Sequence, residues 1–378
     1  MSMTPDQQML EDTARQFFAE RSPPGAVRAN RTAGRSFDPT LWQQIGELGF
    51  SGALIPESHG GSGIGYRGLG LVLEAAGRTL CASPLLQSSF IGAAAVLRHG
   101  SAAQQANLLP RIAAGELTLA LAVDETPHHH PENTRTVARH VDGGWVLNGR
   151  KRFVADGDSA SLLLTLARID TAGAESDALR WFLVPSATAG VTRQRLHTVD
   201  GEGFADIEFA AVDLGADAAL GTASPASWQD VLDVACIALA STMQGAAEAA
   251  LALTLDHLKT RTQFGQLIGS FQSLQHRVAR LHVDLQLARA AVTGALDELD
   301  ARGHVTADPR LHRLASLCKA LCGDALHDVS NETVQLHGGI GMTDVHDSGL
   351  FLKRARVLET LYGTSSHHRD RYARLAGI

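Results

Sequence analysis

The order of hydrophobic patterns along the chain restricts the folds that it can adopt. Helical spacing of apolar residues covers residues 1–116 and returns over residues 223–378, where Leu274 and Val278 belong to one stripe. Between them, residues 117–222 hold short strand-like runs separated by Gly and Asn turn signals. We therefore expect an α+β protein with three parts: a helical domain, a small all-β domain and a second helical domain.

The composition is that of an ordinary globular protein of more than one domain. The chain has 378 residues, which exceeds the usual size of a single core. Hydrophobic residues make up 44% and charged residues 19%, so the chain is not of the disordered class. The net charge is −7 and the basic residues are dispersed, which argues against a nucleic-acid-binding surface.

The cysteines show no pairing pattern. They are Cys81, Cys236, Cys318 and Cys322. The last two lie one helical turn apart, so a metal or redox role is one interpretation. Small buried apolar residues are the simpler one, because no ligand spacing accompanies them. We predict no metal site and a reducing compartment.

The N-terminus reads as the start of a helix. Thr4, Pro5 and Gln7 match an N-cap, a first helical residue and a capping box. The segment lacks the apolar region of a signal peptide. We find no run of ~20 uninterrupted apolar residues, so we expect no membrane span and a cytoplasmic location.

The first stretch unlike a generic helix covers residues 261–277, between two long helical patterns. One interpretation is a helix–helix connection with glycine caps. The other is a binding site, in which Arg261 meets a phosphate while Phe264 and Gln272 line an aromatic ligand. Arginine suits phosphate because its planar fork donates two parallel hydrogen bonds.

The second stretch is rich in glycine and covers residues 335–343. Gly338, Gly339 and Gly341 permit positive φ angles and a close approach of backbone to a ligand. The pattern is neither a Walker loop nor a Rossmann fingerprint, since no strand precedes it. Its alternative is a helix C-cap and turn. The third stretch has the pattern of a hairpin, with turn signals at residues 143–144 and 148–149, followed by Phe153.

Taken together, in this order and spacing, the three stretches resemble the acyl-CoA dehydrogenase family. The resemblance covers essentially the whole chain. It implies an N-terminal helical domain, a middle β-barrel or sandwich domain and a C-terminal four-helix bundle. The ending LYG…HH is similar to that of the pimeloyl-CoA-dehydrogenase-like small-subunit type. The resemblance implies an acyl-CoA substrate, FAD as cofactor, an electron-transfer flavoprotein as acceptor, and a homo-oligomer or a hetero-oligomer with a second dehydrogenase-like chain.

The resemblance also implies which residues meet FAD. On the surface that faces a neighbouring subunit these are Arg261, Gln263, Phe264, Gln272, Gln335, Gly338 and Gly339. In the β domain Phe153 and Ala155 fall where the family has an aromatic residue and a threonine beside the flavin ring, and Thr364 belongs to the last Gly-Thr motif.

One segment departs from the family. Residues 121–125 match a strand whose end touches the flavin, but the chain then reads TPHHHPENT instead of a Gly-Ser-Asp turn. The run from His128 to His130 could bind a metal; an exposed loop is the preferred interpretation, because adjacent imidazoles do not converge on one ion without a supporting fold.

The catalytic base of the family is missing from both customary positions. The family removes the α-proton of an acyl thioester with a glutamate while hydride leaves for the flavin. That glutamate precedes the Gly-Thr motif, where this chain has Tyr362, or lies on the long helix before Arg261, where it has Ala235. Tyrosine, with a pKa of ~10, is a poor base at neutral pH.

Two nearby acids are considered as substitutes. Asp233 lies about 200° around the helix from Ala235, so we expect it to face elsewhere and to contact CoA or solvent. Glu359 could share a face with Tyr362 and is a weak candidate for the base. We expect His367 and His368 to lie on a solvated helix face, with a flavin or adenine contact as the alternative.

Three hypotheses follow for the activity. The chain is a subunit of a hetero-oligomeric dehydrogenase in which a partner supplies the glutamate, or a homomeric flavoenzyme with a displaced base, or a non-catalytic flavin-binding scaffold. The first is favoured, because both base positions are empty of carboxylates while the flavin-binding motifs are retained.

Overall fold

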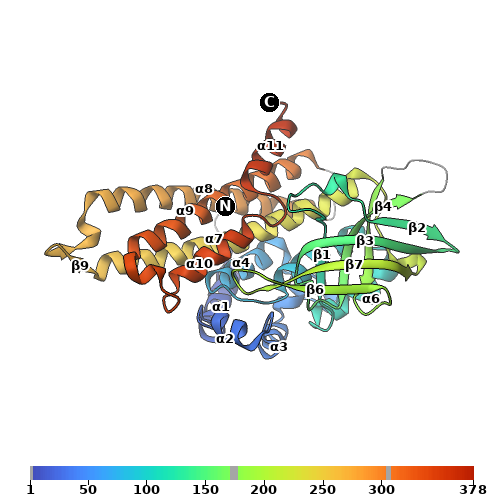
Figure 1. The fold of residues 1–378 in the computed structure, drawn as a ribbon, viewed down its shortest axis with the longest axis horizontal. Helices are drawn as coiled ribbons and strands as arrows, with labels where there is room; N and C mark the ends of the chain where they lie inside the picture. Colours follow the sequence, from blue (N-terminus) through green and yellow to red (C-terminus); the bar gives the residue numbers. More distant parts are fainter. Residues whose placement is uncertain (1–2, 171–177, 304–307) are drawn as a thin grey trace.

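The computed structural model describes residues 3–170, 178–303 and 308–378, and its elements follow the order helical, β, helical (Figure 1). This confirms the predicted α+β class. The bundle of long helices extends away from the sheet, so the β domain and the tip near β9 occupy opposite ends of the molecule. Among the described residues one helix, Ser227–Thr260, is long and apolar enough to cross a membrane, and 89% of its apolar window is buried inside the protein.

The N-terminal part is built from short helices. They are α1 (Pro5–Arg21), α2 (Ala26–Ala33), α3 (Pro39–Glu47), α4 (Gly65–Arg78), the π-helical turn η3 (Leu85–Gly92), α5 (Ala93–His99) and α6 (Ala102–Ala113), with 3₁₀ turns η1 (Phe50–Gly52) and η2 (Glu57–His59). The predicted start of α1 is confirmed: the Thr4 side chain accepts a hydrogen bond from the Gln7 N–H, and the Gln7 side chain returns one to Thr4. The pair satisfies two donors that the helix leaves open.

The middle part is one eight-stranded sheet in the order β6-β7-β3-β2-β4-β5-β8, with β1 paired to β4. Its strands are β1 (Leu119–Ala122), β2 (Val137–Val141), β3 (Gly144–Ala155), β4 (Leu162–Asp170), β5 (Leu179–Pro185), β6 (Val191–His197), β7 (Gly203–Leu214) and β8 (Ala219–Leu220), with 3₁₀ turns η4 (Pro131–Asn133) and η5 (Ala216–Ala218). Both faces of β1 are buried, because its side chains alternate between two hydrophobic cores.

One of the two predicted hairpin turns is wrong. The β2–β3 turn forms at Asp142 and Gly143, both with positive φ, next to the predicted Gly-Gly signal. Asn148 and Gly149 instead lie inside β3 at a register shift against β7. The Asn148 side chain accepts a hydrogen bond from the Ala211 N–H at 2.8 Å, which satisfies a donor at the bulge.

The C-terminal part is a bundle of long helices. They are α7 (Pro225–Thr260), α8 (Gln272–Arg302), α9 (Pro309–His337) and α10 (Ser348–Leu358), with α11 (Ser365–Ala376) packed on α9. Between α7 and α8 lie the strands β9 (Thr262–Gln263) and β10 (Gln266–Leu267) and the turn η6 (Ile268–Ser270); η7 (Gly338–Met342) follows α9. The four-helix bundle predicted from the resemblance corresponds to α7–α10.

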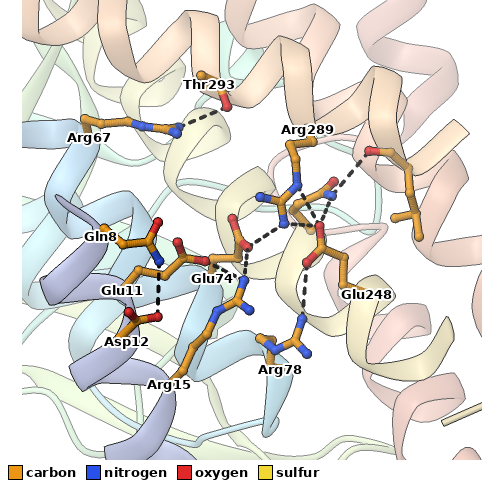
Figure 2. A network of polar contacts seen from close by, with 12 residues as sticks. Gln8, Glu11, Asp12, Arg15, Arg67, Glu74, Arg78, Glu248, Arg289 and Thr293 are labelled. Atoms are coloured by element: carbon orange, nitrogen blue, oxygen red, sulfur yellow. Dashed lines mark hydrogen bonds and ion pairs between the residues drawn. The ribbon is translucent and has the colours of Figure 1, made fainter. Parts of the chain in front are cut away.

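A network of charged side chains joins the N-terminal helices to this bundle (Figure 2). Arg289 of α8 lies 2.8 Å from a Glu74 oxygen of α4 and donates to Glu248 of α7, while Arg78 lies 3.2 Å from the second Glu248 oxygen. Burial and the neighbouring Glu248 raise the pKa of Glu74. The network therefore fixes α4 against α7 and α8 through matched charges.

Candidate functional site

The turn between α10 and α11 places Tyr362 inside the protein. Its side chain is 2% exposed, and its φ of +56° lies in the left-handed region. That conformation costs a non-glycine residue about 1–2 kcal/mol. The hydroxyl lies 2.9 Å from Gln87 Nε2 and 3.0 Å from Gln87 Oε1, and the same Oε1 accepts from the Leu121 N–H of β1. Gln87 thus ties the Tyr362 hydroxyl to the first strand.

Tyr362 cannot act as a base here. Burial raises the pKa of its hydroxyl well above the usual value, and the hydrogen bond with Gln87 offsets this only in part. The second customary position, Ala235, is fully buried and has no ionisable group. Its neighbour Cys236 has its Sγ 3.9 Å from the Tyr362 carbonyl oxygen, so the structure brings both positions together. Burial raises the pKa of Cys236 to about 12, which keeps the thiol protonated.

The role predicted for Asp233 does not fit its surroundings. The side chain is fully buried rather than exposed, and its Oδ1 lies 2.7 Å from Arg371 of α11. Its Oδ2 bonds to His312 of α9. Asp233 does face away from Ala235, as predicted. It is nevertheless not exposed, because other elements cover every side of α7 around residue 233. We therefore assign Asp233 to an ion pair that fastens α7 to α9 and α11.

Glu359 is also held by other side chains. Its carboxylate pairs with Arg356 and lies 3.1 Å from His327 Nδ1, at a site where the His327 side chain is 47% exposed. The Glu359 carboxylate is thus already engaged by two other side chains, which does not favour it as the missing base.

Histidines from two distant segments meet beside the Tyr362 turn. The His129 Nδ1 lies 2.8 Å from Asp124 Oδ1, and the His129 ring stands edge-on to that of His367 at 5.2 Å. A Cβ built on Gly363 would lie 3.3 Å from the His129 ring. The prediction of an exposed loop is right for His128 and His130 but wrong for His129, whose side chain is 7% exposed.

The solvated face predicted for α11 is wrong for His368, which is 2% exposed because α11 packs on α9. Burial lowers the pKa of His367 to about 4 and that of His368 to about 2, so both rings are neutral. Within the described ranges, no three His, Cys, Asp or Glu side chains are arranged to hold a metal ion.

The β domain carries an exposed aromatic ring at one of the positions predicted to meet the flavin. Phe153 is 43% exposed with φ +51°, and the Arg152 guanidinium lies 5.1 Å from its ring centroid. Ala155 is 7% exposed and ends β3. An exposed aromatic ring next to a small residue fits the edge of a flat cofactor such as a flavin, which is what the resemblance implies for these two positions.

The opposite end of α7 is open. Phe264 at the tip of the β9–β10 hairpin is 89% exposed with φ +54°, and Arg261 caps α7 without an ion pair among the described residues. The other residues predicted for the cross-subunit surface are exposed as well: Gln263, Gln272, Gln335, Gly338 and Gly339. An exposed guanidinium can donate to a phosphate, and an exposed aromatic ring can stack on a planar ligand.

The open end cannot share a ligand with the Tyr362 turn. Cys236 and Arg261 are 25 residues apart on α7, which corresponds to about 38 Å along the helix. The Thr364 hydroxyl accepts a hydrogen bond from the His367 N–H and begins α11, so its geometry is accounted for by helix capping.

We call the buried surroundings of the Tyr362 turn the closed site. Two of its residues were not anticipated from the sequence. Gln87 lies in an apolar segment, and Lys319 of α9 donates to the carbonyl oxygens of Glu359 and Gly363. The sequence contains one signal for the burial of Lys319, namely its position within an otherwise apolar stripe of a helix. His129 belonged to a conspicuous run, but its pairing with Asp124 depends on the turn after β1.

Comparisons with known proteins cover the whole chain. The family models described as acyl-CoA dehydrogenase N-terminal, middle and C-terminal domains match residues 4–116, 125–212 and 226–376. The chain is 32% identical over 356 residues to acyl-CoA dehydrogenase IpdE2 of Mycobacterium tuberculosis, covering 93% of this chain and 92% of that protein.

Solved structures share the fold. The structure named "Tcur3481-Tcur3483 steroid ACAD G363A variant" superimposes with a TM-score of 0.89 at 29% identity, covering 98% of each chain. A chain of the ChsE4-ChsE5 complex from Mycobacterium tuberculosis gives a TM-score of 0.89 at 24% identity, covering 100% of this chain and 98% of that one.

Proposed function

The chain belongs to the acyl-CoA dehydrogenase family, and we propose that it is the subunit of a hetero-oligomeric dehydrogenase that supplies flavin-binding surface while a partner chain supplies the catalytic carboxylate. Members of the family are FAD-dependent oxidoreductases. When bound, FAD would accept the hydride that leaves the β-carbon of an acyl-CoA thioester.

The observation that carries the proposal is the state of Tyr362. It stands where the family has its base, it is buried, and its hydroxyl is committed to Gln87. No carboxylate stands at Ala235 either, and Asp233 is held by Arg371. Abstraction of an α-proton needs a positioned base with a pKa near the working pH. The partner must therefore bring that group.

The open end of α7 supports the other half of the proposal. Arg261 has no internal ion pair among the described residues, and Phe264 exposes nearly its whole ring. An unpaired arginine suits a pyrophosphate, and an exposed aromatic side chain suits a stacked ring. Gln335, Gly338 and Gly339 would extend this surface by close backbone approach. We propose that these residues complete a flavin site on the partner.

The relatives point in the same direction. The name of one 29%-identical structure joins two components, Tcur3481 and Tcur3483, and calls the protein a steroid ACAD. By analogy we propose that this chain also works beside a second dehydrogenase-like chain. An acyl-CoA substrate, an electron-transfer flavoprotein as acceptor, a cytoplasmic location and a pimeloyl-CoA-dehydrogenase-like subtype stay predictions.

One observation favours the second candidate, a homomeric enzyme with a displaced base. His129 is oriented by Asp124 and packs against Gly363, directly beside the customary base position. An imidazole oriented by a carboxylate is a common general base. For this candidate to work, Tyr362 would have to leave its buried position. The third candidate, a scaffold, predicts flavin binding with no turnover in any combination of chains.

Co-expression tests the proposal. The partner to use is a neighbouring-gene chain of the same family with Glu before its Gly-Thr motif. We expect a stable complex that contains FAD and oxidises an acyl-CoA. Replacing the partner's Glu by Gln should abolish oxidation, whereas Tyr362→Phe in this chain should preserve it. Activity that survives the partner substitution and is lost in His129→Asn would instead establish the displaced base.

A further inference from the structure

Lys319 of α9 makes contacts on both sides of the Tyr362 turn. Its Nζ lies 3.0 Å from the carbonyl oxygen of Glu359 and 2.7 Å from that of Gly363. The residue is fully buried. A single ammonium therefore joins the two ends of the short segment that carries Tyr362, and it does so through the backbone rather than through any side chain of the turn.

The turn needs such support. Tyr362 has φ +56° and Gly363 has φ +101°, so two consecutive residues lie in backbone regions that favour glycine. The third carbonyl, that of Tyr362 itself, accepts from His368 Nε2 at 2.8 Å. Lys319 and His368 thus satisfy carbonyl groups that the turn would otherwise leave buried without donors.

The environment of Lys319 is unusual when it is set beside the other fully buried lysine. Lys151 of β3 lies 2.8 Å from a Glu125 oxygen, which compensates its charge. Lys319 forms no ion pair with a carboxylate in the described part of the chain, and carbonyl dipoles surround its Nζ instead. Burial lowers the pKa of both lysines to about 8. Burial of a charge without a counter-ion is costly unless hydrogen bonds compensate it, and for Lys319 two carbonyl oxygens do so.

We propose that Lys319 is a positioning residue that clamps the turn of residues 359–363 and so keeps Tyr362 inserted as a plug in this chain's own site. The inference rests on the proposed function in one respect, namely that Tyr362 occupies the place of the base. Because the clamp acts on backbone carbonyls, it is independent of the side chain at position 362 and would hold a glutamate introduced there in the same turn.

The clamp has a direct chemical readout in Cys236. The Cys236 Sγ lies 3.9 Å from the Tyr362 carbonyl oxygen, and Cys236 is only 2% exposed. The thiol is therefore buried against the turn. If the turn leaves its position, Cys236 becomes accessible to a thiol reagent. Alkylation by N-ethylmaleimide, mapped by mass spectrometry, separates Cys236 from the partly exposed Cys81.

Lys319→Met is the first variant and Lys151→Met its matched control, since both remove a fully buried lysine. We expect labelling of Cys236 to become faster by about tenfold or more in Lys319→Met, because local opening exposes it. Labelling should stay within about twofold of the wild type in Lys151→Met. Unchanged labelling in folded Lys319→Met, or an equal increase in Lys151→Met, would overturn the proposal.

Tyr362→Phe decides the matter if Lys319→Met does not fold. This variant removes the hydroxyl contact with Gln87 but leaves both Lys319 contacts in place. Cys236 should remain protected, since the backbone clamp holds the turn. Rapid labelling of Cys236 would show that Gln87, and not Lys319, fixes the plug. None of these measurements involves a partner chain, so their failure is distinct from failure of the proposed function.

Discussion

The two ends of α7 differ in what they leave unsatisfied. At the Tyr362 end, buried polar side chains are paired inside the protein, as Tyr362 is with Gln87 and Asp233 with Arg371. At the far end, Arg261 and Phe264 face outward without such partners in the described chain. Under the proposed function, the open end would serve another molecule, whereas buried side chains fill the chain's own site.

The two ends of α7 are too far apart to contact the same flavin ring. About 38 Å of helix separates Cys236 from Arg261, so one bound flavin ring cannot contact both. The charged network of Glu74, Glu248 and Arg289 joins α4, α7 and α8 along the bundle. Under the proposed function, the open end would complete a neighbour's site irrespective of what occupies the closed end.

The largest expected difference between the two ends is in the free energy of unfolding when one aromatic residue at each end is replaced by alanine. Tyr362→Ala should lower the free energy of unfolding by about 3–5 kcal/mol, because a buried ring leaves a cavity. Phe264→Ala should change it by less than about 0.5 kcal/mol, since the ring is exposed. Urea unfolding of the isolated chain measures both. Equal losses would mean that the two ends do not differ in packing.

A smaller effect is expected at the open end when the partner is present. Arg261→Ala should weaken FAD binding by the complex by about 10–100-fold, the value of a lost charge-assisted hydrogen bond. The stability of the isolated chain should not change. Fluorescence titration with FAD measures the affinity. The control is Lys259→Ala, which changes an exposed lysine two residues before Arg261. Equal affinity in Arg261→Ala and the wild type would remove Arg261 from the flavin surface.

The smallest effect concerns pH at the closed end. Burial lowers the pKa of Lys319 to about 8 from its usual 10.5, so the unfolded chain binds more protons above pH 8 and stability rises with pH. Between pH 8 and 9 the wild type should gain about 1 kcal/mol relative to Lys319→Met. Urea unfolding midpoints of both proteins at both pH values measure this difference in stability. Ionisation of the cysteine thiols contributes equally to the two proteins and so cancels. An identical pH dependence of the two proteins would contradict the shift.

Much of the fold follows from local patterns. The change from helical to alternating spacing and back predicts the three parts, and the Thr4 capping box predicts the first helix start. The Asn148-Gly149 signal failed because a bulge in β3 uses the same residue types as a tight turn. The Asn148 side chain instead satisfies the Ala211 N–H, which lies 63 residues away on another strand.

The closed site was only half predictable. The absence of a carboxylate at Tyr362 and Ala235 is visible in the sequence, but the partners of Tyr362 are not. Gln87 lies 275 positions away, and no local pattern indicates that its amide is buried. His368 and Asp233 were expected at the surface because each helix was judged alone. Packing of α11 on α9 buries His368, and Asp233 is covered by Arg371 of α11 and His312 of α9.

Anaerobic flavin bleaching tests the central claim most directly. The chain is purified alone, loaded with FAD, and titrated with short-chain, long-chain and steroid-side-chain acyl-CoAs; the titration is then repeated with the co-expressed partner. We predict no bleaching by the chain alone and bleaching once the partner's glutamate is present. Stoichiometric bleaching by the chain alone would contradict the account, because it would require a base within a site that Tyr362 and Lys319 are proposed to keep closed.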